Sequence, residues 1–180
     1  EFLRKTVGTW PALRSVEGKE MLFNAMVLAV DSTKVVLRSG FAPSVIYIVG
    51  GTNNNETLSM VELYDPQNAS WKQLASMADK RSAFSCVALG GKLYAVGGRG
   101  DAGRAFDTAE VYDPQTDGWQ PLAKMTTARV GLGLVTVGGK IYAIGGQKNG
   151  WALDSVEAYD PQLGAWALVA SMSVKRKKNA

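Results

Sequence analysis

A seven-residue segment occurs three times in this chain at a nearly constant interval. The copies are VIYIVGG, KLYAVGG and KIYAIGG, and their first glycines are Gly50, Gly97 and Gly145. Recurrence of one pattern about every 20–50 residues is the signature of a repeat protein, in which each unit packs mainly against its neighbours. The fold must therefore be assembled from copies of one small unit.

The repeat continues beyond the glycines in a constant order. Each glycine pair is followed by a variable polar stretch and then by MVELYDP, TAEVYDP or SVEAYDP. A tryptophan, a methionine and an arginine come next at fixed distances. Leucine follows two of the tryptophans by three residues but follows the third, as Leu168, by two. The repeated positions after the glycines are Tyr64, Asp65, Trp71, Met77, Arg81; Tyr112, Asp113, Trp119, Met125, Arg129; Tyr159, Asp160, Trp166, Met172 and Arg176.

Each unit is expected to contain four short β-strands. In the second unit these are residues 82–89, 92–96, 108–112 and 118–123. The turns LGGK and VGGK fit tight hairpins whose residues need a positive φ. Proline cannot donate to a sheet ladder, so Asp-Pro marks the end of the third strand.

Four-stranded sheets that are apolar on both faces bury them by stacking around an axis, as the blades of a β-propeller do. The glycine pairs are expected where blades crowd together, because glycine lacks a Cβ. The tryptophans of the fourth strands, together with Tyr47, Tyr94 and Tyr142 of the second strands, are expected to fill the space between blades. The glycines are Gly50, Gly51, Gly97, Gly98, Gly145 and Gly146.

These motifs resemble the kelch repeat, and their spelling is most similar to the propellers of BTB–kelch substrate adaptors. The resemblance implies an all-β fold: a partial kelch β-propeller of three four-stranded antiparallel blades plus an extra N-terminal strand. The predicted repeats are residues 20–77, 78–125 and 126–172. Residues 1–19 would hold the last strand of a preceding blade, and residues 173–180 would be a basic tail that begins a truncated blade.

The first repeat is longer than the others. Residues 21–30 match the first strand of the other units in register, which leaves an insertion near residues 31–44 before the second strand. A short helix at MLFNAMVLAV is the alternative. With three blades and no vacancy for the N-terminal strand, the chain is expected to be an arc of a longer array, and two copies could complete a six-bladed ring.

Composition excludes several classes of site. The chain has no histidine and a single cysteine, Cys86. Catalytic sites with an imidazole base, ordinary zinc sites and copper sites therefore lack their ligands. No cofactor or metal is predicted. No apolar run reaches the ~18 residues of a membrane span, and a cytoplasmic location is expected.

Binding is expected at the variable loops after each glycine pair, because a rigid scaffold often presents variable loops to partners. By the resemblance, the residue after the glycine pair and the arginine after the methionine face the partner. An arginine can hold a carboxylate through two hydrogen bonds, so the predicted ligand is a protein or an acidic peptide segment. The predicted partner-binding residues are Arg81, Arg99, Arg129, Arg104, Asn54, Gln147, Asn149 and Trp151.

An alternative remains open for the two repeated arginines, because repeated positions in such arrays commonly serve the scaffold. Arg81 and Arg129 would then link neighbouring blades. The terminal VKRKK could be a nuclear-localisation or nucleic-acid patch, but a solvated end is favoured because the basic run is short and isolated. The sequence does not favour nucleic-acid binding.

Three functions are compatible with these features. The first is a non-enzymatic protein-binding module, which the resemblance extends to the substrate-recognition part of a ubiquitin-ligase adaptor. A cullin scaffold would be recruited through a BTB domain that this sequence does not contain. The second is an actin-binding or cytoskeletal scaffold, and the third is a sugar-modifying propeller enzyme without a visible catalytic constellation.

Overall fold

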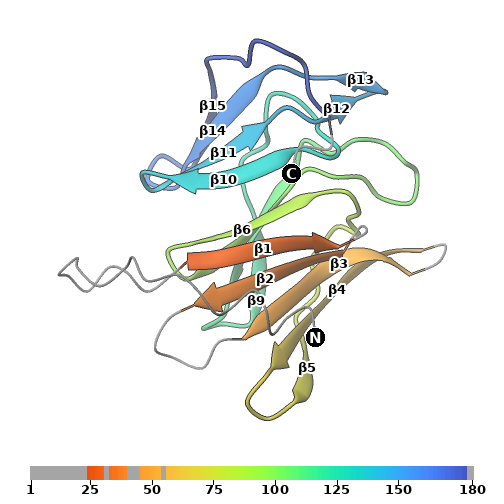
Figure 1. Ribbon diagram of the computed structural model, residues 1–180, viewed down its shortest axis with the longest axis vertical. Helices are drawn as coiled ribbons and strands as arrows, with labels where there is room; N and C mark the ends of the chain where they lie inside the picture. The colour runs from red at the N-terminus through yellow and green to blue at the C-terminus, as the bar shows by residue number, and fades with distance from the viewer. Residues whose placement is uncertain (1–23, 31–32, 40–44, 54–55, 178–180) are drawn as a thin grey trace, which may run out of the picture.

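The computed structural model describes residues 24–30, 33–39, 45–53 and 56–177, and these ranges contain fifteen β-strands and no helix. Within these ranges there is no helix that is long and apolar enough to span a membrane. Thirteen of these strands form three sheets that follow one another along the chain and lie side by side in space (Figure 1). Each sheet is one blade of a partial propeller.

The first sheet has five antiparallel strands in sequence order. They are β1 (Asn24–Val30), β2 (Thr33–Ser39), β3 (Ile46–Asn53), β4 (Glu56–Asp65) and β5 (Ser70–Leu74). The register of β3 and β4 shifts between Val49 and Gly51, and both strands continue beyond this irregularity to Asn53 and Glu56.

The second and third sheets have four antiparallel strands each. The second contains β6 (Ser85–Leu89), β7 (Lys92–Val96), β8 (Ala109–Asp113) and β9 (Gly118–Pro121). The third contains β10 (Gly133–Val137), β11 (Lys140–Ile144), β14 (Val156–Asp160) and β15 (Ala165–Val169). A separate hairpin, β12 (Gln147–Lys148) with β13 (Trp151–Ala152), projects beyond the third sheet (Figure 1). The four strands predicted for the second unit are confirmed.

The first sheet differs from its prediction. Thr33–Ser39 pairs with β3, so the segment predicted as an insertion supplies the strand that precedes β3. Asn24–Val30 pairs with the other edge of β2 and is a fifth strand. The assignment of residues 21–30 to the position next to β3 was therefore wrong, and so was the helical alternative. The strand expected near residues 10–16 lies outside the described residues.

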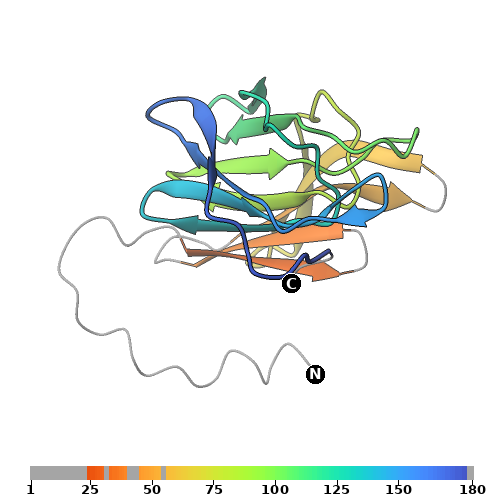
Figure 2. The ribbon, with the colours of Figure 1, turned by 90° about the horizontal axis from the view of Figure 1, so that it is seen from above.

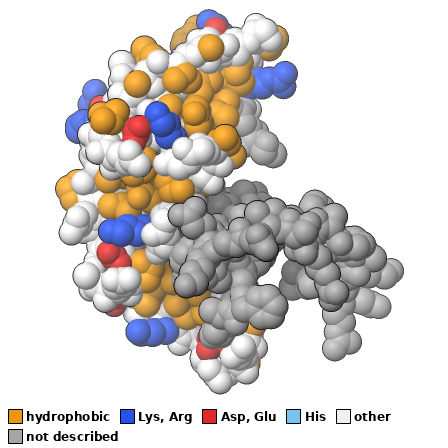
Figure 3. Space-filling model, turned by 90° about the vertical axis from the view of Figure 1, so that its left-hand side faces the viewer, with side chains coloured by type: hydrophobic (Ala, Val, Ile, Leu, Met, Phe, Trp, Pro, Cys, Tyr) orange, Lys and Arg blue, Asp and Glu red, His pale blue; other side chains and the backbone are white. Residues whose placement is uncertain are grey.

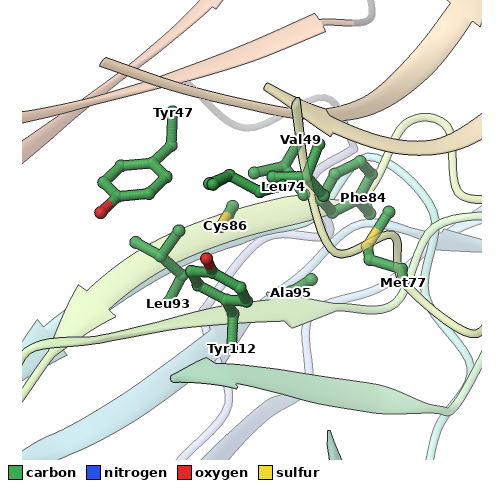
Figure 4. Close-up of a cluster of buried hydrophobic side chains, with 10 residues drawn as sticks. Tyr47, Val49, Leu74, Met77, Phe84, Cys86, Leu93, Ala95 and Tyr112 are labelled. Atoms are coloured by element: carbon green, nitrogen blue, oxygen red, sulfur yellow. The ribbon is translucent and has the colours of Figure 1, made fainter. Parts of the chain in front are cut away.

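The interior lies between the sheets. Between the first and second sheets, Tyr47, Val49 and Leu74 pack against Phe84, Cys86, Leu93, Ala95 and Tyr112 (Figure 4). Two further clusters join the second sheet to the third, through residues such as Val96, Leu132 and Tyr159. Apolar burial on both faces of the middle sheet fixes its position between the other two.

The glycine pairs lie at or near the ends of β3, β7 and β11, the second of the four repeated strands in each sheet. Gly97 has a φ of +67°, and a Cβ there would be 2.6 Å from the carbonyl oxygen of Arg129. Gly50 has a φ of +55°, and a Cβ there would be 2.8 Å from the carbonyl oxygen of Arg81. Both the left-handed conformation and the close approach require glycine. The predicted crowding at these pairs thus comes from the connecting segments.

The repeated aromatics pair within each sheet. Tyr64 with Trp71, Tyr112 with Trp119 and Tyr159 with Trp166 have ring centroids 4.8–5.3 Å apart. The indole N–H groups of Trp119 and Trp166 donate to Ala75 and Ala123 in the segments that leave the preceding sheet. Trp71, in the first sheet, is 55% exposed. In the second and third sheets, the repeated tryptophan therefore stabilises the contact with the preceding sheet.

Candidate functional site

The arginine of the first connecting segment, Arg81, is fully buried. Its peptide N–H donates to Leu58 and its carbonyl accepts from Gly51, both in the first sheet. Its guanidinium reaches into the second sheet, where Nε and Nη2 donate to Glu110 Oε1 at 3.1 and 3.0 Å. Nη1 donates to the carbonyl of Gly97 at 2.9 Å. One residue thus links two sheets through its backbone and its side chain.

Arg129 repeats this arrangement one joint later and is also fully buried. Its carbonyl accepts from Gly98 in the second sheet. Its guanidinium donates to Gly145, to Ser155 and to Glu157 Oε1 in the third sheet, each between 2.8 and 2.9 Å. The partner-binding prediction for Arg81 and Arg129 is therefore corrected: neither offers surface to a partner, and the contacts fit the alternative of a link between blades.

The glutamate of each E-x-Y-D-P run was not assigned a role from the sequence. Glu110 is 3% exposed and Glu157 is 0% exposed. Besides the arginine, each accepts two peptide N–H groups from the connecting segment, from Ala78 and Asp79 or from Thr126 and Thr127. The signal was present, because these glutamates recur with the same period as the arginines.

An open cleft lies between the loops of the second and third sheets. Its volume is about 500 Å³. Its lining comes from four segments: the β5–β6 segment, the β7–β8 loop, the β9–β10 segment and the β12–β13 turn. The lining residues are Asp79, Arg104, Ala105, Phe106, Asp107, Thr108, Lys124, Thr126, Ala128, Lys148 and Asn149. The loop after β7 and the β12–β13 hairpin lie at the same end of the molecule, at the right in Figures 1 and 2.

The β7–β8 loop is held in place on one side of this cleft. The peptide N–H of Phe106 donates to Gly98, and that of Gly103 donates to Gly100. Asp101 Oδ1 accepts the peptide N–H of Thr57 from the first sheet at 2.8 Å, and this bond holds the pKa of that carboxyl below its usual value. The guanidinium of Arg81 lies 5.3 Å from the ring centroid of Phe106. The β7–β8 loop, which forms one side of the cleft, is therefore held in position by contacts within the chain.

The charges around the cleft are unequally paired. Asp79 Oδ2 lies 2.9 Å from Nη2 of Arg81, and Asp107 Oδ1 lies 3.6 Å from Nζ of Lys124. Arg104 and Lys148 are exposed, and neither forms an ion pair within the ranges that the structure describes. The cleft thus presents two unpaired cations beside the half-buried Phe106.

The other predicted residues lie around this cleft or outside the described residues. Arg104 and Asn149 line it, and Asn149 adopts a φ of +51° in the turn between β12 and β13. Trp151 is 81% exposed in β13, next to that turn. Gln147 is half-buried, and its backbone bridges to Val130. Arg99 is exposed and pairs through its backbone with Ser82.

Asn54 lies outside the described residues. The residues predicted from the sequence did not include Lys124 and Lys148, which also line the cleft. No cluster of three or more histidine, cysteine, aspartate or glutamate side chains within the described ranges could hold a metal ion.

Comparison with known proteins agrees with this architecture. The model of the KLHDC2/KLHL20/DRC7 Kelch-repeats domain matches residues 28–179. Mouse Kelch-like protein 9 is 44% identical over 63 residues, which are 32% of this chain and 10% of that protein. Zebrafish Kelch-like ECH-associated protein 1B is 34% identical over 90 residues, which are 50% of this chain and 15% of that protein. These matches thus span a small part of each relative.

A solved structure with the same arrangement is that of YjhT. It superposes with a TM-score of 0.66 over 84% of this chain and 66% of that chain, at 16% sequence identity. At this identity the likeness concerns the fold alone. The kelch-repeat model matches most of the sequence, including the three sheets with their repeated glycine pairs, tyrosines and tryptophans. The chain belongs to the kelch-repeat family.

Proposed function

We propose that this chain is a non-enzymatic protein-binding module that holds an acidic peptide segment in the cleft between its second and third sheets. The observation that carries the proposal is the pair of unpaired cations, Arg104 and Lys148, which come from two different loops and line the same cleft as Phe106. A carboxylate can accept two hydrogen bonds from a guanidinium, and an ammonium adds a second positive charge. The aromatic ring supplies apolar contact area.

The exposed Trp151 extends this surface. Large aromatic side chains often anchor protein interfaces because they bury much area with few rotatable bonds. Trp151 follows Lys148 across the β12–β13 turn, so a segment that leaves the cleft on this side would pass it. The expected ligand therefore carries one or two carboxylates followed by an apolar residue.

The similarity to Kelch-like proteins supports a finer proposal, in which the bound segment belongs to a substrate that is presented to a ubiquitin ligase. Recruitment of the ligase would require a domain other than the one described here. Interaction with a cullin-containing complex in cells, followed by loss of a bound substrate's ubiquitination in cleft variants, would support this step.

The cleft proposal is tested by panning a random twelve-residue peptide library displayed on phage against the chain. We expect enrichment of peptides with aspartate or glutamate, and at least a tenfold loss of their affinity in the double variant Arg104→Glu, Lys148→Glu. Lys72→Glu is a matched control, because Lys72 is an exposed cation on β5 that does not line the cleft. Enriched peptides that bind the double variant as tightly as the wild type would refute the proposal.

A further inference from the structure

The loop after β7 carries a carboxylate that bridges the first and second sheets. Asp101 Oδ1 accepts the peptide N–H of Thr57 at 2.8 Å, and Asp101 Oδ2 lies 3.6 Å from Nζ of Lys80. Thr57 belongs to the first sheet, and Lys80 belongs to the segment between β5 and β6. A carboxylate of the second sheet is thus bound between a peptide N–H and a cation that both precede it in the chain.

The repeat identifies the residues at the same three positions between the second and third sheets. Thr57 precedes the carbonyl that accepts the peptide N–H of Arg81, and Ala105 precedes the carbonyl that accepts the peptide N–H of Arg129. The residue before each arginine and the third residue after each glycine pair give two more equivalences. The equivalent pairs are Thr57 and Ala105, Lys80 and Ala128, and Asp101 and Asn149.

The three equivalent residues between the second and third sheets all line the cleft. They are Ala105, Ala128 and Asn149, and none of their side chains carries a charge. Ala105 is half-buried, whereas Thr57 is 5% exposed. Among the described residues, the peptide N–H of Ala105 has no hydrogen-bond acceptor. The cleft therefore lies where Asp101 binds one contact earlier, and it leaves a peptide N–H to be satisfied by water or by a ligand.

Positive charge reaches this position from residues that differ between the two contacts. Arg104 immediately precedes Ala105, whereas the residue that precedes Thr57 is Glu56. Lys148 lines the cleft from the β12–β13 hairpin. A carboxylate that accepts the peptide N–H of Ala105 would therefore have a guanidinium beside it, in place of the ammonium that faces Asp101.

Lysines at the opposite end of the molecule are already paired. The β10–β11 turn lies at the left in Figure 1, and Lys140 follows this turn with its Nζ 3.0 Å from Asp160. Lys92 forms the same pair with Asp113 in the second sheet, also at 3.0 Å. Figure 3 faces this end and shows basic and acidic side chains next to one another. The cations of the cleft are thus the better placed to bind an anionic ligand.

We propose that an aspartate side chain of the bound segment takes the place that Asp101 has one contact earlier, and accepts the peptide N–H of Ala105 beside Arg104. This inference rests on the proposed use of the cleft for an acidic peptide, and it specifies how one carboxylate is recognised. Hydrogen bonds to an ionised acceptor are shorter and stronger than neutral ones. The contact that Asp101 makes with Thr57 is an internal copy of the bound state.

The test is a titration of the isotopically labelled chain with acetyl-aspartyl methylamide, followed by NMR. We expect the amide proton of Ala105 to move downfield by about twice the shift that the neutral isostere acetyl-asparaginyl methylamide causes, because charge-assisted hydrogen bonds are roughly twice as strong. The amide proton of Thr57 is the internal control and should not move, because Asp101 already accepts it. An unmoved Ala105 amide, or equal shifts with both probes, would overturn the inference.

A second experiment removes the donor without changing a side chain. Replacing Ala105 with lactic acid exchanges its N–H for an ester oxygen, and should weaken the acidic peptides enriched on the chain at least about tenfold, since hydrogen bonds to charged groups are among the strongest. Replacing Ala102 with lactic acid is the matched control, because Ala102 is an exposed alanine of the same loop that does not line the cleft. This control should bind the peptides like the wild type.

The two experiments separate this inference from the proposed function. If the peptides bind the Ala105 ester as tightly as the wild type but not the double variant Arg104→Glu, Lys148→Glu, the role of the Ala105 N–H is wrong and the cleft proposal stands. If no acidic peptide is enriched, the cleft proposal fails, and the response of Ala105 to acetyl-aspartyl methylamide alone decides whether a carboxylate binds there.

Discussion

The contact between the first and second sheets (the first joint) and that between the second and third sheets (the second joint) are built alike. They differ in how many hydrogen bonds the guanidinium of the buried arginine makes to carboxylates. At the first joint, Arg81 binds Glu110 through two nitrogens, and Asp79 accepts a further bond from Nη2 at 2.9 Å. At the second joint, Arg129 binds Glu157 through Nη2 alone, and its buried Nε has no hydrogen-bond partner. The position of Asp79 is occupied there by Thr127.

The comparison separates what the repeat requires from what one joint adds. At both joints a buried glutamate, a glycine carbonyl and a hydroxyl surround the guanidinium. The hydroxyl belongs to Thr108 at the first joint and to Ser155 at the second. The second carboxylate belongs to the first joint only. A buried ion pair contributes little net stability, but removal of one partner leaves an uncompensated charge. The second joint should therefore be the more sensitive to loss of its single carboxylate.

The largest expected effect comes from neutralising the buried glutamates. Glu157→Gln should lower the free energy of unfolding by about 3–5 kcal/mol, because Arg129 then has no anionic partner. Glu110→Gln should cost less, about 1–3 kcal/mol, because Asp79 still neutralises Arg81. Urea denaturation followed by tryptophan fluorescence, at one protein concentration, measures both. Equal losses for the two variants would show that Asp79 does not compensate.

A somewhat smaller effect is expected at the glycine pair of the second joint. Gly97→Ala should lower the free energy of unfolding by about 2–4 kcal/mol, because it combines a left-handed backbone with a clash against the carbonyl of Arg129. Gly138→Ala is the matched control, since Gly138 also has a positive φ but no atom within 4 Å of a Cβ. The control should lose only about 1–2 kcal/mol. A control as damaging as Gly97→Ala would remove the argument from close approach.

The missing carboxylate of the second joint can be supplied. Thr127→Asp should raise the free energy of unfolding by about 0.5–1 kcal/mol, because the new side chain takes the position that Asp79 has beside Arg81. The reverse change, Asp79→Thr, should lower it by a similar amount at the first joint. The same denaturation measurement applies. If Thr127→Asp destabilises the chain, repulsion from Glu157 outweighs the attraction to Arg129.

The periodicity of the sequence predicted the sheets well wherever a residue has counterparts in the other repeats. The strands of the second sheet and the glycine pairs follow directly from the three aligned copies. The first sheet was misassigned because the connection between Thr33–Ser39 and β3 is longer than that between β6 and β7, so register with Phe84 pointed to an earlier segment. The spacing of the other repeats cannot place a strand in a repeat whose connection has a different length.

The candidate site was harder to predict than the fold for a related reason. Spacing located Arg81 and Arg129 but could not show that both side chains turn inward toward a glutamate. The cleft depends on residues from separate loops, such as Arg104 and Lys148, which the sequence does not relate to one another. Only the arrangement of the second and third sheets brings them together.

The smallest expected effect concerns a carboxylate at the first joint that the second joint lacks. Asp117 Oδ1 accepts the peptide N–H of Ala75 from the segment that leaves the first sheet and the hydroxyl of Tyr112, whereas Gly164 occupies this position in the third sheet. These bonds, that of Ala75 first, hold the pKa of Asp117 below its usual value. A carboxyl whose folded pKa is depressed stabilises the fold above its ordinary pKa of about 3.9 and loses this contribution as the pH falls through the folded value.

Asp117→Asn should therefore be less stable than the wild type near pH 7, and the difference should shrink as both are acidified below about pH 3. Asp160→Asn is the comparison variant, because its pKa is lowered chiefly by Lys140 within the third sheet and not by a bond across a joint. We expect Asp117→Asn to weaken the first joint in particular, as faster hydrogen exchange at the peptide N–H of Ala75. A pH-independent difference between Asp117→Asn and the wild type would mean that the carboxylate stabilises the joint through its shape and not through its charge.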